Sequence, residues 1–215
     1  MDELIRWLTS IPFVDVIEWI GTFAFAISGI RLASKKDFDL FGAYVVGLVT
    51  AIGGGTIRDL LLRVEPFWMN STRYIICTGI AVVFVIIFRR HLIRLNITFF
   101  LFDAIGLALF TVVGIEKTLA CGLPFWVAVI MGTITGVAGG IMRDIIITEI
   151  PLIFRKEIYA SSCLLGSVCY YICMRLHCDT TVNEVFTSLV IIFSRVLAVK
   201  FGIGLPKIKK EEGVV

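Results

Sequence analysis

Charged residues are scarce in this sequence. They make up 17% of its 215 residues, whereas apolar residues make up 58%, and the mean hydropathy is +0.96. A soluble domain has about 25% charged and 45–50% apolar residues. The chain therefore has too little polar surface to cover a water-soluble globule. We predict an all-α integral membrane protein with a single membrane domain over residues 1–215.

Histidine is almost absent, and the cysteines show no paired spacing. Only His91 and His177 are present, and most of the six cysteines lie in apolar runs, where cysteine acts as a small hydrophobic residue. These residues supply neither a zinc-type ligand set nor a histidine suited to catalysis at membrane depth. We therefore expect no enzyme, no cofactor and no metal other than a permeating monovalent cation.

Seven apolar segments approach the length that crosses a bilayer. A hydrocarbon core of about 30 Å needs about 20 mostly apolar residues per helix. The candidate segments are Phe13–Ala33, Leu40–Leu62, Thr72–Phe88, Ile97–Ile115, Pro124–Ile147, Glu157–Met174 and Val182–Phe201. The connections between them are short and hold most of the charges, so we predict seven transmembrane helices.

Basic residues are shared unevenly between the two sides of the membrane. The side of the N-terminus receives Arg6, Arg63, Arg73, Lys117 and Arg175. The opposite side receives Arg31, Lys35, Lys36, Arg89, Arg90, Arg94, Arg155, Lys156, Lys200, Lys207, Lys209 and Lys210. Basic loops favour the cytoplasm, so the N-terminus is predicted outside and the C-terminus inside. Basic clusters next to apolar spans indicate contact with membrane lipid and no nucleic-acid partner.

The sequence contains an internal repeat. A shift of 85 residues places "IGGGTIRDLL" on "VAGGIMRDII" without a gap. The same shift pairs glycine, proline, tyrosine and acidic positions: Gly21 with Gly106, Gly29 with Gly114, Gly47 with Gly132, Pro66 with Pro151, Tyr74 with Tyr159, and Glu18 with Asp103. Chance matches would not concentrate on such residues, so we interpret the halves as two copies of one unit.

Each copy holds three predicted spans, which determines how the two copies are oriented. Repeat one covers about 14–90, repeat two about 99–175, and a seventh helix over about 182–201 lies outside the repeat. An odd number of spans makes the second copy enter the membrane from the other side. Inverted repeats of this kind place a transport site near the bilayer midplane. The seventh helix is predicted to be peripheral or to serve packing.

Glycines interrupt the second span of each copy. Gly53, Gly54 and Gly55 form a run in the first copy, and Gly139 and Gly140 occupy the matching place in the second. Glycine costs about 1 kcal/mol relative to alanine in a helix, so the run predicts a kink or local unwinding. Freed backbone at membrane depth must be covered by protein or water, and a hydrated path between the copies would cover it. Close helix packing is the alternative interpretation.

An Arg-Asp pair follows the glycines in each copy. These pairs are Arg58 with Asp59 and Arg143 with Asp144. An unpaired charge at the bilayer centre costs at least about 2.5–3.5 kcal/mol, and such residues usually face the bundle interior and carry function. Neighbours on a helix point about 100° apart, so we expect each arginine and its adjacent aspartate to have different partners. We predict that these residues line or gate a pore; the alternative is that they only join helices.

Acids on the first span of each copy are the predicted partners of the arginines. We predict that Glu18 pairs with Arg58 and, by the repeat, that Asp103 pairs with Arg143. Lys117 ends the fourth span, where extension of its amine to the interface is the favoured interpretation and a role as a gate charge is the alternative.

The doubled motif, "GGGTIRD" and "AGGIMRD" in a seven-span chain, resembles the bacterial members of the trimeric intracellular cation (TRIC) channel family. These sequences are also described as a glycine-transporter-type domain. The resemblance covers about Val14 to Phe201. It implies a homotrimer in a bacterial inner membrane, with a pore in each protomer between the glycine-containing second and fifth helices. It also implies passage of potassium and, as a second ion, sodium.

The residues by themselves leave the transport mode open. A potassium-permeable channel would use carbonyls freed at the helix breaks as oxygen ligands for a cation. A carrier for glycine or a similar zwitterion would use the same breaks, with N–H groups binding the carboxylate and carbonyls binding the ammonium. An intramembrane enzyme lacks a suitable nucleophile and base, and a purely structural protein remains a further alternative.

Overall fold

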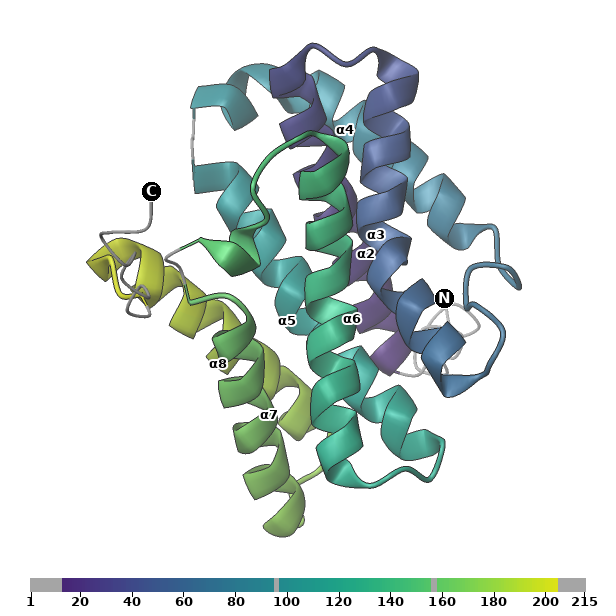
Figure 1. Ribbon diagram of the computed structural model, residues 1–215, viewed down its shortest axis with the longest axis vertical. Coiled ribbons are helices and arrows are strands. Elements are labelled where there is room, and N and C mark those ends of the chain that lie inside the picture. The colour runs from purple at the N-terminus through teal and green to yellow at the C-terminus, as the bar shows by residue number, and fades with distance from the viewer. Residues whose placement is uncertain (1–12, 95–96, 156–157, 205–215) are drawn as a thin grey trace, which may run out of the picture.

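The computed structural model describes residues 13–94, 97–155 and 158–204, the side chains of 89–97 excepted. These residues form seven α-helices and two short 3-10 helices (Figure 1). Their bounds are α2 Phe13–Ala33, η1 Ser34–Lys36, α3 Leu40–Leu62, α4 Arg73–Arg94, α5 Ile97–Ala120, α6 Phe125–Ile146, η2 Leu152–Phe154, α7 Ala160–Arg175 and α8 Thr180–Phe201. The predicted seven helices are all present, and their ends lie within a few residues of those predicted, apart from the later ends of α4 and α5.

Part of the basic asymmetry lies outside the described residues. This applies to Arg6, Lys156, Lys207, Lys209 and Lys210, and to the side chains of Arg89, Arg90 and Arg94.

Within the described ranges, five helices are long and apolar enough to cross a membrane, judged by length and composition. They are α2 with η1, α3, α5, α6 and α8, while α4 contributes the shorter apolar stretch Arg73–Phe88. The 16 residues of α7 span about 24 Å at 1.5 Å per residue, less than the bilayer core. In Figure 1 the chain leaves α6, turns back along the bundle through η2, and begins α7 near mid-height.

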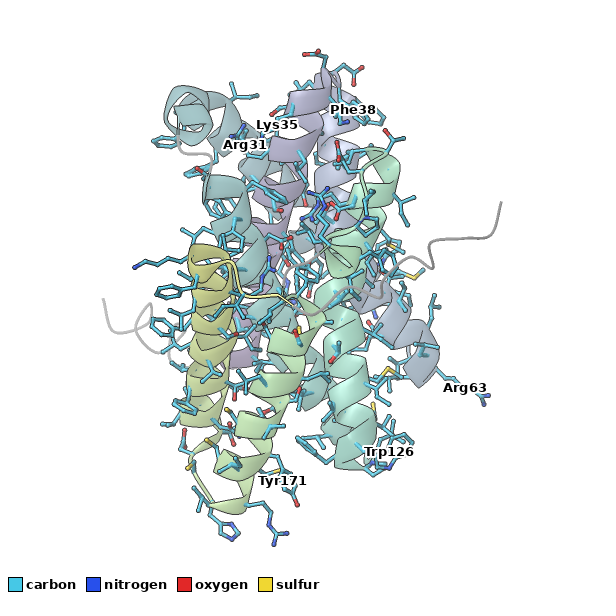
Figure 2. All side chains as sticks on the ribbon, turned by 60° about the vertical axis from the view of Figure 1, so that its left-hand side comes forward. Arg31, Lys35, Phe38, Arg63, Trp126 and Tyr171 are labelled. Carbon is cyan, nitrogen blue, oxygen red and sulfur yellow. The ribbon has the colours of Figure 1, made fainter. Side chains whose placement is uncertain are left out.

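We name the two ends of the bundle by Arg63, which Figure 2 labels, and by Lys36, which follows the labelled Lys35 in the chain. The Arg63 end holds the α3–α4, α5–α6 and α7–α8 connections, and the Lys36 end holds the α2–α3 and α6–α7 connections. At the Lys36 end, Lys36 Nζ lies 2.7 Å from Glu149 Oε1. This hydrogen bond and the positive charge hold the pKa of Glu149 below its ordinary value, and the pair joins the α2–α3 connection to the α6–α7 connection.

The repeat is visible in how the helices pack. Helices α2, α3, α5 and α6 form the centre, in which α2 packs on α3 and α5, and α6 packs on α5 and α3. Helix α4 covers α2, and α7 contacts α6, so each copy contributes its third helix to the periphery. Helix α8 lies against α5 and α7, on one side only. The arrangement has two inverted three-helix units and one added helix.

The outward faces of the peripheral helices are apolar. On α4, Ile76, Ile80, Val83 and Ile87 are each more than half exposed and follow each other at three- and four-residue spacing. A contiguous stripe of this kind on a water-soluble protein would cause association. In a bilayer this stripe faces lipid tails. A peripheral helix can therefore be hydrophobic on its outward face as well as on the face that packs in the bundle.

Candidate functional site

The glycines of α3 and α6 allow the two helix backbones to touch. A Cβ atom added at Gly54 would overlap the carbonyl oxygen of Thr135, and one added at Gly139 would overlap the carbonyl oxygen of Thr50. The two contacts are related by the 85-residue repeat. Only glycine permits so close an approach of the two helix backbones.

The predicted unwinding at the glycines is wrong. Helix α3 is continuous over Leu40–Leu62 and α6 over Phe125–Ile146, through both glycine runs. The other glycines also make room for neighbours: a Cβ at Gly53 would lie 2.5 Å from Met142 Sδ, and one at Gly140 would lie 2.6 Å from the Tyr159 hydroxyl. At Gly55 the neighbour is the Phe67 ring. Close packing covers the backbone, so the helical hydrogen bonds are retained.

Arg143 is tied to three helices. Its side chain is fully buried, and its Nη1 donates to Asp103 Oδ1 at 2.5 Å and to Ser28 Oγ at 2.7 Å. Its Nε donates to Asp144 Oδ1 at 2.9 Å. The predicted pair of Asp103 with Arg143 is present, and α2, α5 and α6 meet at this guanidinium. A buried charge needs such partners because desolvating it alone costs several kcal/mol.

Arg58 has a different partner from the predicted one. Its Nε donates to Asp59 Oδ1 at 2.8 Å, just as Arg143 Nε donates to Asp144 Oδ1. The expectation that each arginine and its adjacent aspartate have different partners is therefore wrong. Glu18 instead accepts a hydrogen bond from the Tyr74 hydroxyl at 2.8 Å. The predicted Glu18–Arg58 pair is therefore wrong, because α4 brings a nearer donor to Glu18. Arg58 is still close enough to Glu18 for their charges to attract each other.

The second oxygen of each motif aspartate is bound by equivalent backbone groups. The amide of Phe67 donates to Asp59 Oδ2 at 2.9 Å, and the amide of Leu152 donates to Asp144 Oδ2 at 3.0 Å. Phe67 and Leu152 are themselves related by the 85-residue shift. Each aspartate thus joins its helix to the connection that follows, and this explains why proline-containing connections recur in the two copies.

Lys117 lies inside the site rather than at the interface. Its Nζ lies 3.1 Å from Asp59 Oδ1 and 3.2 Å from Asp59 Oδ2, and its side chain is 32% exposed. The Phe67 ring lies beneath both neighbouring cations, with its centroid 5.7 Å from Lys117 Nζ and 5.6 Å from Arg58 Cζ. The favoured prediction for Lys117, an amine extended to the interface, is not the observed arrangement.

Two neutral clusters result, and we name each by its arginine. The Arg58 cluster is Arg58, Asp59, Glu18, Lys117 and Tyr74. The Arg143 cluster is Arg143, Asp144, Asp103, Arg195 and Tyr159. Each contains two cations and two acids by formal charge. The first lies toward the Arg63 end of the α3–α6 crossing and the second toward the Lys36 end.

Several members of these clusters were not foreseen from the sequence. Tyr74 and Tyr159 appear in the repeat, so the match of tyrosine on tyrosine is the signal that could have singled them out. Arg195 lies outside the repeat, and Ser28, which bonds to the Arg143 cluster, is matched by Val113 in the second copy. For Arg195, the signal was a lone arginine in the last predicted span.

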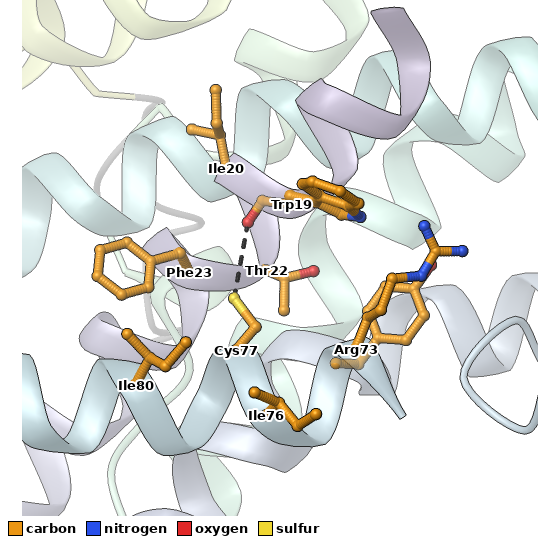
Figure 3. Close-up of a pocket in the computed structure, with 9 residues that line it drawn as sticks. Trp19, Ile20, Thr22, Phe23, Arg73, Ile76, Cys77 and Ile80 are labelled. Atoms are coloured by element: carbon orange, nitrogen blue, oxygen red, sulfur yellow. Dashed lines mark hydrogen bonds between the residues drawn. The ribbon is translucent and has the colours of Figure 1, made fainter. Parts of the chain in front are cut away.

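A groove open to the lipid side lies behind Tyr74. It has a volume of about 460 Å³ and lies between α2 and α4, and the Arg73 guanidinium stands 5.6 Å from the Trp19 ring at one end (Figure 3). Cys77 Sγ donates to the Trp19 carbonyl oxygen at 3.9 Å, the contact drawn as a dashed line in Figure 3. The rest of the lining is mostly apolar: Ile20, Phe23, Ile76 and Ile80, together with Thr22. Among the described residues, no group of three or more His, Cys, Asp or Glu could hold a metal ion.

Comparisons with known proteins agree with the repeat and the fold. A family model described as "Glycine transporter" matches residues 15–90 and again 100–175. A UPF0126 membrane protein of Vibrio cholerae is 38% identical over 89% of this chain and 81% of its own length. The UPF0126 inner membrane protein YadS of Escherichia coli is 37% identical over 91% of this chain and 96% of its own.

The fold has solved relatives as well. The crystal structure of the TRIC trimeric intracellular cation channel orthologue from Rhodobacter sphaeroides superposes with a TM-score of 0.83 at 32% identity, covering 89% of this chain and 99% of that one. The match extends over the repeats and beyond them. This chain therefore belongs to the bacterial trimeric intracellular cation channel family, whose domain is also described as a glycine transporter.

Proposed function

We propose that the protein is a potassium-permeable monovalent cation channel, with a pathway in each protomer between the inverted repeats and beside the α3–α6 crossing. The observation that carries this proposal is the pair of buried, charge-neutral clusters on either side of one glycine contact. Buried ionisable residues inside a membrane domain mark ion pathways more often than packing. The descriptions of solved relatives as cation channels support the same conclusion.

Neutralised arginines remove the main objection to cation passage. Each guanidinium is bonded to at least one aspartate, at 2.8 Å for Arg58 and at 2.5 and 2.9 Å for Arg143. The carboxylates carry oxygens of the kind that replace water around a dehydrated cation. The pathway uses side-chain oxygens in place of the freed carbonyls that the sequence suggested, because the helices are continuous.

The Lys117–Asp59 contact is the proposed gate. Lys117 is the one cation of the two clusters that is substantially exposed, at 32%, whereas Arg58, Arg143 and Arg195 are at most 1% exposed. Withdrawal of its amine leaves the Arg58 cluster with one excess negative charge and frees oxygens of Asp59 for a cation. We assign the arrangement in which Lys117 contacts Asp59 and α3 touches α6 to a closed state of the proposed pathway.

The assembly and orientation belong to the same proposal. We infer a homotrimer in a bacterial inner membrane, with the Arg63 end outside and the Lys36 end in the cytoplasm. The support is the excess of basic residues toward the Lys36 end and the description of solved relatives as trimeric channels.

A carrier for glycine or a similar zwitterion is the second candidate. The description of the matching family model favours it. A zwitterion would place its ammonium near Asp59 and its carboxylate near Arg58 or Lys117, all of which lie in one cluster. A carrier must expose the site to each side in turn, whereas a channel needs a continuous path.

The deciding experiment is reconstitution of the full-length protein in planar bilayers and in vesicles. A channel gives unitary currents in potassium, with a smaller sodium current measured under the same conditions. Saturable uptake of labelled glycine without unitary current would instead establish the carrier. Absence of both fluxes would contradict the proposed function. Arg175→Gln, an exposed charge at the Arg63 end, serves as a control that leaves the wild-type flux unchanged.

A further inference from the structure

The buried side of α8 carries an arginine that reaches the centre of the protein. Arg195 is 0% exposed, although α8 lies outside the repeat and contacts only one side of the bundle. Its Nη2 lies 3.4 Å from Asp103 Oδ2, and its Nη1 donates to the carbonyl of Ile158 at 3.0 Å. The seventh helix was predicted to be peripheral or to serve packing, but it supplies a charge to the Arg143 cluster.

Two aromatic rings hold the same guanidinium. The Cζ atom of Arg195 lies 4.5 Å from the centroid of the Tyr159 ring and 4.9 Å from that of the Phe100 ring. Cation–π contacts of this kind strengthen when water is excluded. Arg195 therefore connects α8 to α5 through Phe100 and Asp103, and to the segment entering α7 through Ile158 and Tyr159.

Arg195 also changes how the second copy uses its tyrosine. In the first copy the Tyr74 hydroxyl donates to Glu18 at 2.8 Å. In the second copy the corresponding Tyr159 hydroxyl is buried without a hydrogen-bond partner, while both oxygens of Asp103 face arginines. A buried hydroxyl without a partner is unusual. The acid–tyrosine contact of the first copy is replaced by an acid–arginine contact in the second.

The two clusters consequently differ in how firmly they are held. Arg143 is bonded to Ser28 of α2, Asp103 of α5 and Asp144 of its own helix, and Arg195 fixes the far oxygen of Asp103. Arg58 is hydrogen-bonded to the aspartate next to it on its own helix. Opening the Arg143 end would leave several buried charges uncompensated, whereas the Arg58 end can open when one exposed amine withdraws.

We propose that Arg195 is a positioning residue that locks the Arg143 cluster, so that the pathway opens more readily at the Arg63 end than at the Lys36 end. The inference rests on the proposed channel function for its consequence and on the contacts above for the lock itself. Without Arg195, Asp103 gains the freedom to accept the Tyr159 hydroxyl, and the second copy then resembles the first.

A double-mutant cycle on thermal unfolding tests the lock without any flux measurement. Tyr159→Phe in the otherwise unchanged protein removes an unbonded hydroxyl, and we expect it to leave the midpoint unchanged or slightly raised. In the Arg195→Gln background the same change removes a newly formed hydrogen bond. There we expect it to lower the midpoint by about 2–4 °C, the size expected for one hydrogen bond in a chain of this length.

Tyr74→Phe is the matched control, because it removes the corresponding bond to Glu18 in the other copy. It should lower the midpoint equally with and without Arg195→Gln. If Arg195→Gln does not fold, the cycle is run on Arg195→Lys, which keeps the charge but not the planar contact with Tyr159, and a smaller shift of the same sign is expected. Equal effects of Tyr159→Phe in both backgrounds would overturn the lock.

Currents through the reconstituted full-length protein test its consequence. Arg195→Gln should raise the open probability roughly twofold or more, the size expected when a residue outside the pathway biases a two-state element. Arg195→Lys should restore most of the wild-type value, and Tyr159→Phe should alter the current only in the Arg195→Gln background. If the wild-type protein carries no cation current, the proposed channel function is refuted. The double-mutant cycle on thermal unfolding then tests by itself whether Arg195 holds the Arg143 cluster. A wild-type current that Arg195→Gln leaves unchanged would refute the assigned role.

Discussion

Lys117, in the last turn of α5, reaches across to Asp59 of α3, with Nζ 3.1 Å from Oδ1. The contact joins the second copy of the repeat to the motif of the first. No corresponding lysine exists in the first copy, where position 32 is leucine. The contact therefore makes the two ends of the pathway unequal.

Replacing Lys117 with Gln should increase potassium current. The change removes an ion pair whose lysine is partly exposed, worth about 0.2–1 kcal/mol, so the open probability should rise by roughly 1.5- to 5-fold. Single-channel recording in symmetrical potassium chloride measures the effect. Lys117→Arg keeps the charge and should stay near the wild-type value, and an unchanged Lys117→Gln current would remove this contact as the gate.

Alanine at the helix crossing should destabilise the protein. Gly54→Ala and Gly139→Ala each push a methyl group into a carbonyl oxygen of the facing helix, and overpacking of this kind costs about 1–3 kcal/mol. Thermal unfolding in detergent measures the loss. Gly79→Ala in α4 is the control, since a Cβ there has no neighbour within 4 Å. It should raise stability by up to about 1 kcal/mol; destabilisation by Gly79→Ala equal to that at the crossing would contradict the packing account.

A pair of mutant cycles should distinguish the two arginines. Asp103→Asn and Arg143→Gln remove members of one buried ion pair. Their combined loss of stability should therefore differ from the sum by about 0.5–3 kcal/mol. Glu18→Gln and Arg58→Gln remove groups that make no direct bond to each other, so their effects should add much more closely. Strong coupling in the second cycle and none in the first would reverse the assignment of partners.

Acid should release the contact between the two connections at the Lys36 end. The pKa of Glu149 is lowered by Lys36, so the folded state binds this proton less readily than the unfolded state. The contribution to stability is present above the ordinary carboxyl pKa and is lost as the pH falls through the lowered value. Comparison of wild type with Glu149→Gln should give a small difference in thermal midpoint at neutral pH that vanishes at low pH. Added salt should also reduce it, and a difference that grows in acid would contradict the assignment.

The sequence predicted best the features that depend on the residues of one segment or on repetition along the chain. Apolar stretches of about 20 residues predict membrane helices because the bilayer demands internal hydrogen bonding, and the helices occur where those stretches lie. The repeat, with three spans per copy, similarly indicates inverted packing. The Asp103–Arg143 pair was also foreseen, since both residues are buried in spans that pack on one another.

The wrong predictions, for the glycine runs and for the partner of Glu18, concern contacts between segments that are distant in the sequence. A glycine run favours an open backbone and a close helix contact alike, and the facing carbonyls of Thr50 and Thr135 selected the close contact. Glu18 had two donors within reach, Tyr74 and Arg58, and the position of α4 selected Tyr74. Sequence spacing contains neither of these distances.

By itself, the sequence determined the membrane class, the helices, the inverted repeat and the placing of a Gly-Arg-Asp motif in each copy, because hydrophobic length and repetition are properties of the chain alone. Only the tertiary structure decided which acid meets which cation. It brought Lys117 to Asp59 and Arg195 to Asp103 from helices far apart in sequence. The physical reason is that a buried charge is stabilised by whichever opposite charge lies within a few ångströms, and that distance is set by how the helices pack.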